Sequence, residues 1–168
     1  MKTVDEGKKV VVYERDGWEF VERKSAKEAV AIIALNELGE LILTEQFRKP
    51  VNARVIDIPA GLVGDEEGHD DPAETAKKEL EEETGHRCDS VERIARGPSS
   101  PGITSEIVSL YRANGARRVG EGGGVGSEDI TVHTVSLEEI ELWLEEREHA
   151  GVLVDLKVWS ALYFAVTR

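Results

Sequence analysis

A short acidic helix that ends at a glycine is the feature that most restricts what this chain can form. Asp71 and Pro72 are typical of a helix N-terminus, and Gly85 is typical of the position just past the last helical residue. These residues predict a helix over 72 to 84, with either Asp71 or Asp70 as its cap. Its core-facing stripe is formed by Ala73, Ala76 and Leu80.

The helix also crowds carboxylates together. Glu79, Glu82 and Glu83 stand three and four residues apart, and like charges at this spacing cost an isolated helix about 0.2–0.5 kcal/mol per pair. Glutamate runs are usually solvated faces. Here, however, an apolar segment with Pro-Ala-Gly, residues 57 to 63, leads through an acidic loop into the helix. This order would bring carboxylates beside a backbone turn, which is the oxygen-rich set that a hard divalent cation prefers.

These residues resemble the signature of the Nudix hydrolases, which is Gly, five residues, Glu, seven residues, Arg-Glu-aliphatic, one residue, Glu-Glu, one residue, Gly-aliphatic. Counted back from Gly85, Glu82 and Glu83 match the paired glutamates and Glu79 matches the glutamate before them. Three residues depart from the pattern, namely Lys78 for the arginine, Asp70 for the upstream glutamate and His86 for the last aliphatic residue.

The opening glycine of the motif has two candidates. An ungapped register selects Gly64, whereas the Pro-Ala-Gly context selects Gly61 and requires a three-residue insertion in the loop. Lys78 lacks the planar fork with which an arginine holds a carboxylate. We therefore expect the metal ligands to be intact but their support to differ from the family pattern.

A glycine-rich segment lies between Asn114 and Ser127. It lacks the Gly-Lys-Ser/Thr ending and the strand-to-helix setting of a phosphate-binding P-loop. Two interpretations stay open, a flexible surface hairpin loop and a mobile lid over the active site. The next residues, Glu128 to His133, resemble the acidic loop that the ADP-ribose pyrophosphatase branch of the family brings over its metals. In that branch a glutamate at the position of Glu128 is either the catalytic base or a further metal ligand.

Other segments resemble the same branch. Pro101 stands sixteen residues past Gly85, about where that subgroup carries a distinguishing proline, in a Ser-Pro-Gly segment that would otherwise be only a turn. In relatives, a tryptophan and an arginine near the N-terminus hold the adenine, often across a dimer interface, and a later arginine contacts phosphate. The residues that the resemblance assigns to the substrate are Trp18, Arg23, Arg48, Pro101, Ser105 and Glu106.

The resemblance implies hydrolysis of a nucleoside diphosphate linked to another group. It assigns Mg²⁺, with Mn²⁺ as an alternative, to the Ala60 carbonyl, Glu79, Glu82, Glu83 and Glu128. Glu128, or failing that Glu82, would orient or deprotonate the attacking water. ADP-ribose would give AMP and ribose 5-phosphate. GDP-mannose, NADH and dinucleoside polyphosphates are alternative substrates, and a non-catalytic sensor that binds ADP-ribose is an alternative of another class.

Composition narrows the class of protein. The formal net charge of −13 argues against a nucleic-acid-binding surface, and 40% hydrophobic residues in 168 suffice for the core of one domain. The single cysteine, Cys88, is expected to be a small packed residue. Residues 1 to 9 are charged and lack an apolar segment, so we expect no signal peptide, and no apolar run is long enough to span a membrane. We expect a cytoplasmic protein that forms a homodimer.

The remaining pattern predicts a single α/β domain over residues 1 to 168. Asp16-Gly17 indicates a hairpin within an N-terminal segment, residues 1 to 25, to which we assign a role in dimer formation. Residues 29–35 and 41–47 indicate a second hairpin. Further strands are expected at 55–58, 91–95, 107–113 and 131–135, and helices at 137–149 and from 156 onwards. The resemblance implies a mixed sheet in an α/β/α sandwich.

Overall fold

A computed structural model describes residues 1–26, 28–64, 71–126 and 128–167. The helices are α1 (Pro72–Thr84), α2 (Ile140–His149) and α3 (Leu156–Thr167). The strands are β1 (Lys2–Glu6), β2 (Val10–Arg15), β3 (Trp18–Arg23), β4 (Glu28–Ala34), β5 (Glu40–Arg48), β6 (Ala53–Asp57), β7 (Ala60–Val63), β8 (His86–Arg87), β9 (Ser90–Pro98), β10 (Ile107–Asn114), β11 (Arg117–Arg118), β12 (Ile130–Ser136) and β13 (Leu153–Val154).

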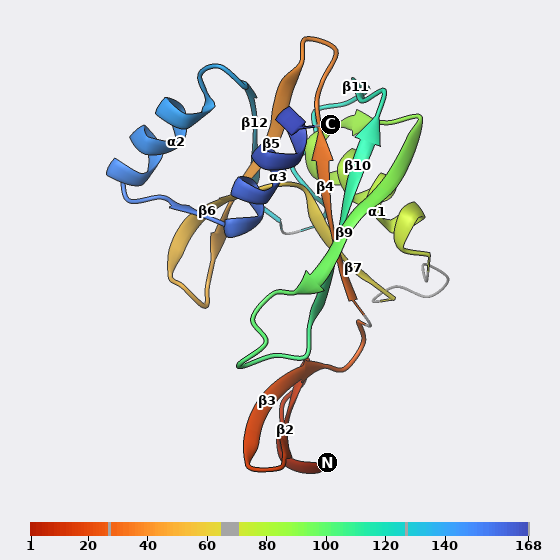
Figure 1. Cartoon of the computed structure of the whole chain (residues 1–168), viewed down its shortest axis with the longest axis vertical. Coiled ribbons are helices and arrows are strands. Elements are labelled where there is room, and N and C mark those ends of the chain that lie inside the picture. Colours follow the sequence, from red (N-terminus) through yellow and green to blue (C-terminus); the bar gives the residue numbers. More distant parts are fainter. Residues whose placement is uncertain (27, 65–70, 127, 168) are drawn as a thin grey trace.

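Two four-stranded sheets form the centre of the fold, in the orders β7-β4-β10-β9 and β12-β5-β6-β13. Both sheets are mixed, because β10 runs parallel to β4 and β13 runs parallel to β6. Helix α1 covers one side, and α2 and α3 cover the other (Figure 1). One apolar core contains Leu80 of α1, and the other contains Leu144 of α2 and Val158 of α3. The predicted α/β/α arrangement with mixed sheets is confirmed.

The N-terminal strands form a separate antiparallel sheet in the order β1-β2-β3, which projects from the body of the molecule (Figure 1). The predicted hairpin at Asp16-Gly17 is confirmed, and β1 is an addition to it. Strand β1 escaped prediction because Lys2–Glu6 is exposed along its whole length and so carries no apolar alternation. The sheet is tied to the body by Val21, whose N–H donates to the Ile103 carbonyl at 2.9 Å.

The predicted pairing of 29–35 with 41–47 is wrong. The chain does turn between them, where Gly39 N donates to the Asn36 carbonyl at 3.0 Å. Beyond an isolated bridge between Leu35 and Leu41, however, β4 joins one sheet and β5 the other. Both strands are almost fully buried, so each is a central strand with a neighbour on either side.

The start and the end of α1 agree with the prediction. Oδ1 of Asp71 accepts a hydrogen bond from Ala73 N at 2.9 Å, and Pro72 is the first helical residue. Gly85 adopts a left-handed φ of 70°, and its N–H donates to the Glu81 carbonyl at 2.8 Å. Asp70, the alternative cap, lies outside the described residues. The second predicted helix begins three residues later than expected, at Ile140.

Cys88 is buried in the core beside α1, as predicted. Burial raises the pKa of its thiol. Within the described residues, every helix is too short or too polar to cross a lipid bilayer.

Candidate active site

Glu79 lies directly against the backbone of β7. A Cβ added to Gly61 would stand 2.0 Å from Oε1 of Glu79 and 2.4 Å from its Cγ. Only a glycine permits this approach, so of the two candidate opening glycines Gly61 is the one that meets the helix. Gly64, with a φ of 83°, begins the loop at the end of β7. Residues 65–70 of that loop, including Asp70, lie outside the described residues.

Glu83 is buried beside the same strand, and its Oε2 accepts a hydrogen bond from Ala60 N at 3.0 Å. The pKa of its carboxyl group is raised from the ordinary 4.5 to about 8, chiefly because burial removes water from the charged form. The negative charges of Glu79 and Glu128 raise this pKa as well, whereas the Ala60 N–H and Arg48 lower it. The site therefore concentrates negative charge that a cation would relieve.

The glycine-rich segment packs against the end of α1. Gly123 N donates to the Glu83 carbonyl at 2.8 Å, and Gly124 N donates to the Glu82 carbonyl at 3.0 Å. These bonds satisfy carbonyls that the last helical turn leaves without partners. A Cβ on Gly122 would stand 2.4 Å from the carbonyl carbon of Thr84, so the two backbones are in direct contact. Gly122 is thus needed for close packing, a role that neither interpretation of the sequence included.

Glu128 follows this segment and points back over it. Its Oε2 accepts a hydrogen bond from Val125 N at 2.9 Å, and a Cβ on Gly124 would stand 2.5 Å from the same oxygen. Since the charge of Glu128 raises the pKa of Glu83, the two carboxylates lie within electrostatic reach of each other. The structure therefore brings Glu128 toward α1 from the start of β12.

The other glutamates of α1 have different surroundings. Glu82 forms an ion pair with Lys78, whose Nζ lies 3.5 Å from its Oε2. Lys78 thus contacts a glutamate of the helix, although it lacks the fork of an arginine. Glu81 points elsewhere and accepts two hydrogen bonds from Arg87, at 2.9 and 2.7 Å. Glu81 is therefore engaged at the surface and not against β7.

The donor set suits a hard divalent cation, because Glu79 and Glu83 meet β7 at a glycine that leaves them room, and Glu128 lies within electrostatic reach of Glu83. As the side chains stand, no three acidic, histidine or cysteine groups among the described residues surround a common point at which an ion would be held. One oxygen of Glu83 is engaged by Ala60 N. Binding of a cation would therefore require these carboxylates to rotate toward it.

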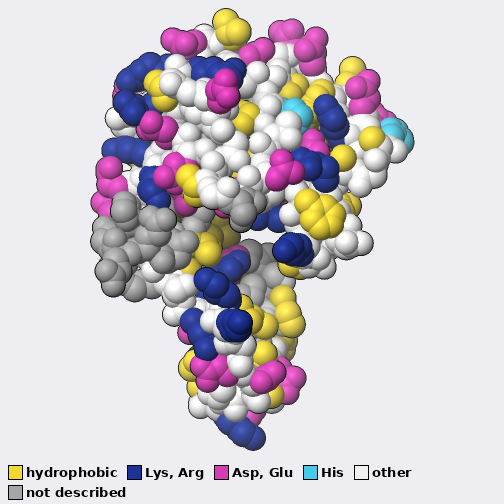
Figure 2. Space-filling view, turned by 180° about the vertical axis from the view of Figure 1, so that it is seen from behind, with side chains coloured by type: hydrophobic (Ala, Val, Ile, Leu, Met, Phe, Trp, Pro, Cys, Tyr) yellow, Lys and Arg dark blue, Asp and Glu magenta, His cyan; other side chains and the backbone are white. Residues whose placement is uncertain are grey.

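Three of the residues assigned to the substrate line a cavity of about 450 Å³. Arg23, Ser105 and Glu106 lie at the junction of the N-terminal sheet with the body, and Figure 2 shows a hollow there with Lys and Arg side chains at its edges. Arg23 Nε donates to Oε2 of Glu106 at 2.8 Å, and Ser105 Oγ donates to Oε2 of Glu22 at 3.2 Å. Glu28 also lines the cavity, and it pairs with Val63 at the end of β7. The cavity thus adjoins the strand that carries Gly61.

Trp18 and Pro101 do not line this cavity. Trp18 is 66% exposed and begins β3, beside the hairpin turn at the far end of the N-terminal sheet (Figure 1). Pro101 is exposed in the turn closed by Ile103 N, which donates to the Ser100 carbonyl at 3.0 Å. Within one chain the structure therefore separates Trp18 from the carboxylates of α1.

Sequence reasoning missed one buried polar group on the far side of the sheet from α1. Glu45 on β5 is buried and pairs with Arg54 on β6. A signal was available, because strict alternation along β5 places Glu45 on the same face as Leu41 and Leu43.

The NUDIX domain model matches residues 26–156, which is most of the chain. This chain belongs to the Nudix family. The match begins after the N-terminal sheet and includes α1, β7 and Glu128. The signature residues and the backbone contacts around them are thus found in the same domain.

Three relatives of this chain carry names that refer to different activities. The methanol dehydrogenase activator of Bacillus methanolicus is 35% identical over 71% of this chain and 63% of its own length. The ADP-ribose pyrophosphatase of Bacillus subtilis (strain 168) is 35% identical over 71% of this chain and 64% of its own. The GDP-mannose pyrophosphatase of Cronobacter sakazakii is 31% identical over 77% of this chain and 68% of its own. This chain therefore spans less than two thirds of the length of the first two.

A solved structure has the same fold. The crystal structure of an ADP compounds hydrolase superposes with a TM-score of 0.70 over 96% of this chain and 87% of that one, at 19% identity. The likeness thus extends over nearly all of this Nudix chain.

Proposed function

We propose that this Nudix protein hydrolyses the pyrophosphate bond of ADP-ribose or a related nucleoside diphosphate sugar. The observation that carries the proposal is the convergence of Glu79 and Glu83 on the backbone of β7, with Glu128 approaching from β12. Relatives named as ADP-ribose and GDP-mannose pyrophosphatases support the substrate class. ADP-ribose would yield AMP and ribose 5-phosphate.

Glu79, Glu82, Glu83, Glu128 and the carbonyl of Ala60 would hold Mg²⁺, or Mn²⁺ in its place. Bound there, the metal would neutralise the diphosphate and lower the pKa of a bound water. The electrostatics of Glu83 support this assignment. Its buried carboxylate lies near the negative charges of Glu79 and Glu128, so a nearby cation would stabilise its charged form.

Glu128 is our candidate for the group that orients or deprotonates the attacking water, with Glu82 as the alternative. Glu128 approaches from outside the helix, whereas Glu82 is engaged by Lys78 at 3.5 Å. Arg48 lies near enough to Glu83 to lower its pKa, a position from which its planar guanidinium would contact a phosphate.

The substrate would extend from these carboxylates into the cavity at the base of the N-terminal sheet. Arg23, Ser105 and Glu106 line that cavity and offer donors and acceptors to a ribose or base. Trp18 lies far from it within one chain, so we assign its adenine-stacking role, together with that of Pro101, to a second copy in a homodimer. The buried thiol of Cys88 agrees with a cytoplasmic location.

A second candidate function follows from the relative named as a methanol dehydrogenase activator. On this alternative the chain binds a nucleotide sugar and acts on another protein, and Lys78 in place of the signature arginine is consistent with slow or absent turnover. GDP-mannose, NADH and dinucleoside polyphosphates remain alternative substrates for the enzyme.

One assay separates these functions. The purified protein is incubated with Mg²⁺ and, in parallel, with ADP-ribose, GDP-mannose, UDP-glucose, NADH and diadenosine polyphosphates, and the nucleoside monophosphate is measured. We expect release of AMP from ADP-ribose, or of the monophosphate of one related sugar nucleotide. Binding of ADP-ribose by calorimetry without any release would favour the sensor. The absence of both binding and release would contradict the proposal.

A further inference from the structure

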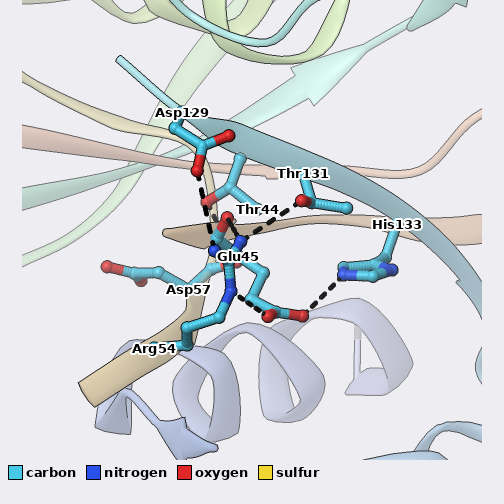
Figure 3. Close-up of polar contacts among 7 residues, drawn as sticks. All are labelled: Thr44, Glu45, Arg54, Asp57, Asp129, Thr131 and His133. Carbon is cyan, nitrogen blue, oxygen red and sulfur yellow. Dashed lines mark hydrogen bonds and ion pairs between the residues drawn. The ribbon is translucent and has the colours of Figure 1, made fainter. Parts of the chain in front are cut away.

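Arg54 on β6 connects two neighbouring strands through one guanidinium (Figure 3). Its Nε pairs with the carboxylate of Glu45 on β5, and its Nη2 donates to the Glu45 carbonyl at 3.1 Å. The same Nη2 donates to Oγ1 of Thr131 on β12 at 3.2 Å, and Nη1 lies 3.8 Å from Oδ2 of Asp129. Arg54 thus ties the beginning of β12 to the centre of its sheet.

This cluster lies on the side of the sheet away from α1. Glu45 alternates with Leu41 and Leu43, which are buried in the core shared with α2 and α3. Thr131 is directly opposite Glu45 in the register of β5 and β12. Arg54 therefore contacts β5 on the face that packs toward α2 and α3. Helix α1 and its carboxylates lie on the opposite side of the fold.

Glu45 is itself firmly held. Its side chain is 8% exposed, and its Oε2 bonds to Nε2 of His133 at 3.0 Å, while its other oxygen faces Arg54. His133 packs edge-on against Trp143 of α2, with ring centroids 5.0 Å apart. Although burial raises the pKa of Glu45, the hydrogen bonds from Arg54 and His133 lower it more, and the carboxylate stays charged. Arg54 therefore has a fixed partner on one side and the start of β12 on the other.

Asp129 directly follows Glu128, so the Arg54 cluster is one residue away from the candidate base. The opposite end of the segment is fixed separately, where Gly123 and Gly124 donate to the carbonyls of Glu83 and Glu82. Glu128 thus stands between two attachments, one to α1 and one to the sheet. Loss of either attachment would loosen the backbone that carries Glu128, whose carboxylate also accepts a hydrogen bond from Val125 N.

We propose that Arg54 is a positioning residue, which fixes the start of β12 so that Glu128 is presented to the carboxylates of α1. This inference rests on the proposed function for the role of Glu128. In this role Arg54 would touch neither substrate nor metal and would act only through the strand.

The first test measures the position of the strand without any catalysis. Hydrogen exchange of the amides from Glu128 to Ser136 is compared in the wild-type protein, Arg54→Met and Arg112→Met. Arg112 is the matched control, because it is half-buried and donates to the Phe164 carbonyl at 2.7 Å, away from β12. We expect exchange about tenfold faster in Arg54→Met alone, since the strand end opens locally. Unchanged exchange in this variant, or an equal rise in both, would overturn the proposal.

The second test uses a double-mutant cycle in the hydrolysis assay. Arg54→Met should lower kcat by about tenfold to a hundredfold with little change in KM, because a small misplacement of a catalytic group is costly. In a Glu128→Gln background the same substitution should cost less than about twofold, since it acts through Glu128. Losses that multiply would refute the positioning role. A wild-type protein without hydrolysis would refute the proposed function instead, and the exchange experiment would still decide on Arg54.

Discussion

The backbone N–H of Ala60 on β7 donates to Oε2 of Glu83 on α1, at 3.0 Å. The two residues are 23 positions apart in the chain, and their bond joins a strand to a helix at a buried carboxylate. The bond partly compensates a charge that burial makes costly. It also restrains Glu83 in the place where a cation would meet it.

Replacement of Glu83 by Gln should abolish turnover and leave the fold intact. The amide oxygen can still accept from Ala60 N, but the negative charge is lost. We expect hydrolysis in Mg²⁺ to fall by about a hundredfold or more, with an unchanged circular dichroism spectrum. Glu81→Gln on the same helix is the control and should retain activity, because Glu81 pairs with Arg87 on the surface. Normal turnover by Glu83→Gln would contradict the metal assignment.

Gly61→Ala should displace Glu79. The new Cβ would stand 2.0 Å from Oε1 of Glu79, so the carboxylate must leave β7 or the backbone must shift. We expect a loss of about 1–3 kcal/mol in the free energy of unfolding and a loss of activity. Gly97→Ala is the control, since nothing lies within 4 Å of its Cβ. Equal urea midpoints and equal rates for the two variants would argue against close packing at Gly61.

Gly122→Ala and Gly126→Ala separate packing from backbone strain. Both glycines have left-handed φ values, 73° and 64°, so both variants carry the same kind of strain. Only at Gly122 does the new Cβ meet backbone, 2.4 Å from the carbonyl carbon of Thr84. We expect a clearly larger drop in Tm and in kcat for Gly122→Ala. Similar melting curves would mean that the contact with α1 is unimportant.

Asp57 should make stability depend on pH. Burial raises the pKa of its carboxyl from 3.8 to about 6, although the nearby Lys157 lowers it. An acid with a raised pKa binds its proton more tightly in the folded state, so its contribution is greatest below pH 4 and is lost as the pH rises toward 6. The free energy of unfolding of the wild type, relative to Asp57→Asn, should therefore fall across this window, by at most about 1.4 kcal/mol per pH unit.

Urea unfolding at several pH values measures this difference. Lys157→Met should extend the fall above pH 6, because Asp57 loses the cation 3.0 Å away. If the free energy of unfolding of the wild type, relative to Asp57→Asn, instead increases with pH, attraction to Lys157 outweighs the effect of burial on the pKa of Asp57.

Trp18→Ala should mainly raise KM for adenine nucleotides. The indole is 66% exposed, so its removal should cost the fold little. Leu38→Ala, at a side chain that is 82% exposed on the turn before β5, is the control. Steady-state kinetics with ADP-ribose and GDP-mannose measure the effect. An equal loss with every sugar nucleotide would indicate a folding or dimer defect rather than stacking on adenine.

Local chemistry made α1 predictable. The cap at Asp71, Pro72 and the left-handed Gly85 act within one turn of the chain, and their effect can be read without knowledge of the rest. The candidate site required more, because the contact of Gly61 with Glu79 depends on how β7 lies against the helix. A glycine at position 61 indicated that another group could approach the backbone closely there. It did not indicate that this group would be the side chain of Glu79.

The false hairpin of β4 and β5 has a related cause. Pairing between neighbouring strands is the usual result of a short turn such as Asn36 to Glu40, and it was expected for that reason. Which partners a fully buried strand takes is decided by distant segments, here β7 and β10 for β4. The contacts of Gly122 with Thr84 escaped prediction in the same way, because they join a loop to a helix end far along the chain.

The divergence of β4 and β5 has a consequence for adaptation of this site. Glu79 and Glu83 are held against β7 in one sheet, whereas Arg48 and Glu128 come from β5 and the start of β12 in the other. The chain crosses between the sheets at Pro59, whose carbonyl accepts from Ile32 N at 2.8 Å. Substitutions at this crossing would alter the spacing between the two groups of residues while leaving each group intact. The two parts of the candidate site can thus shift relative to each other through the angle between the two sheets, without the replacement of any residue in either part.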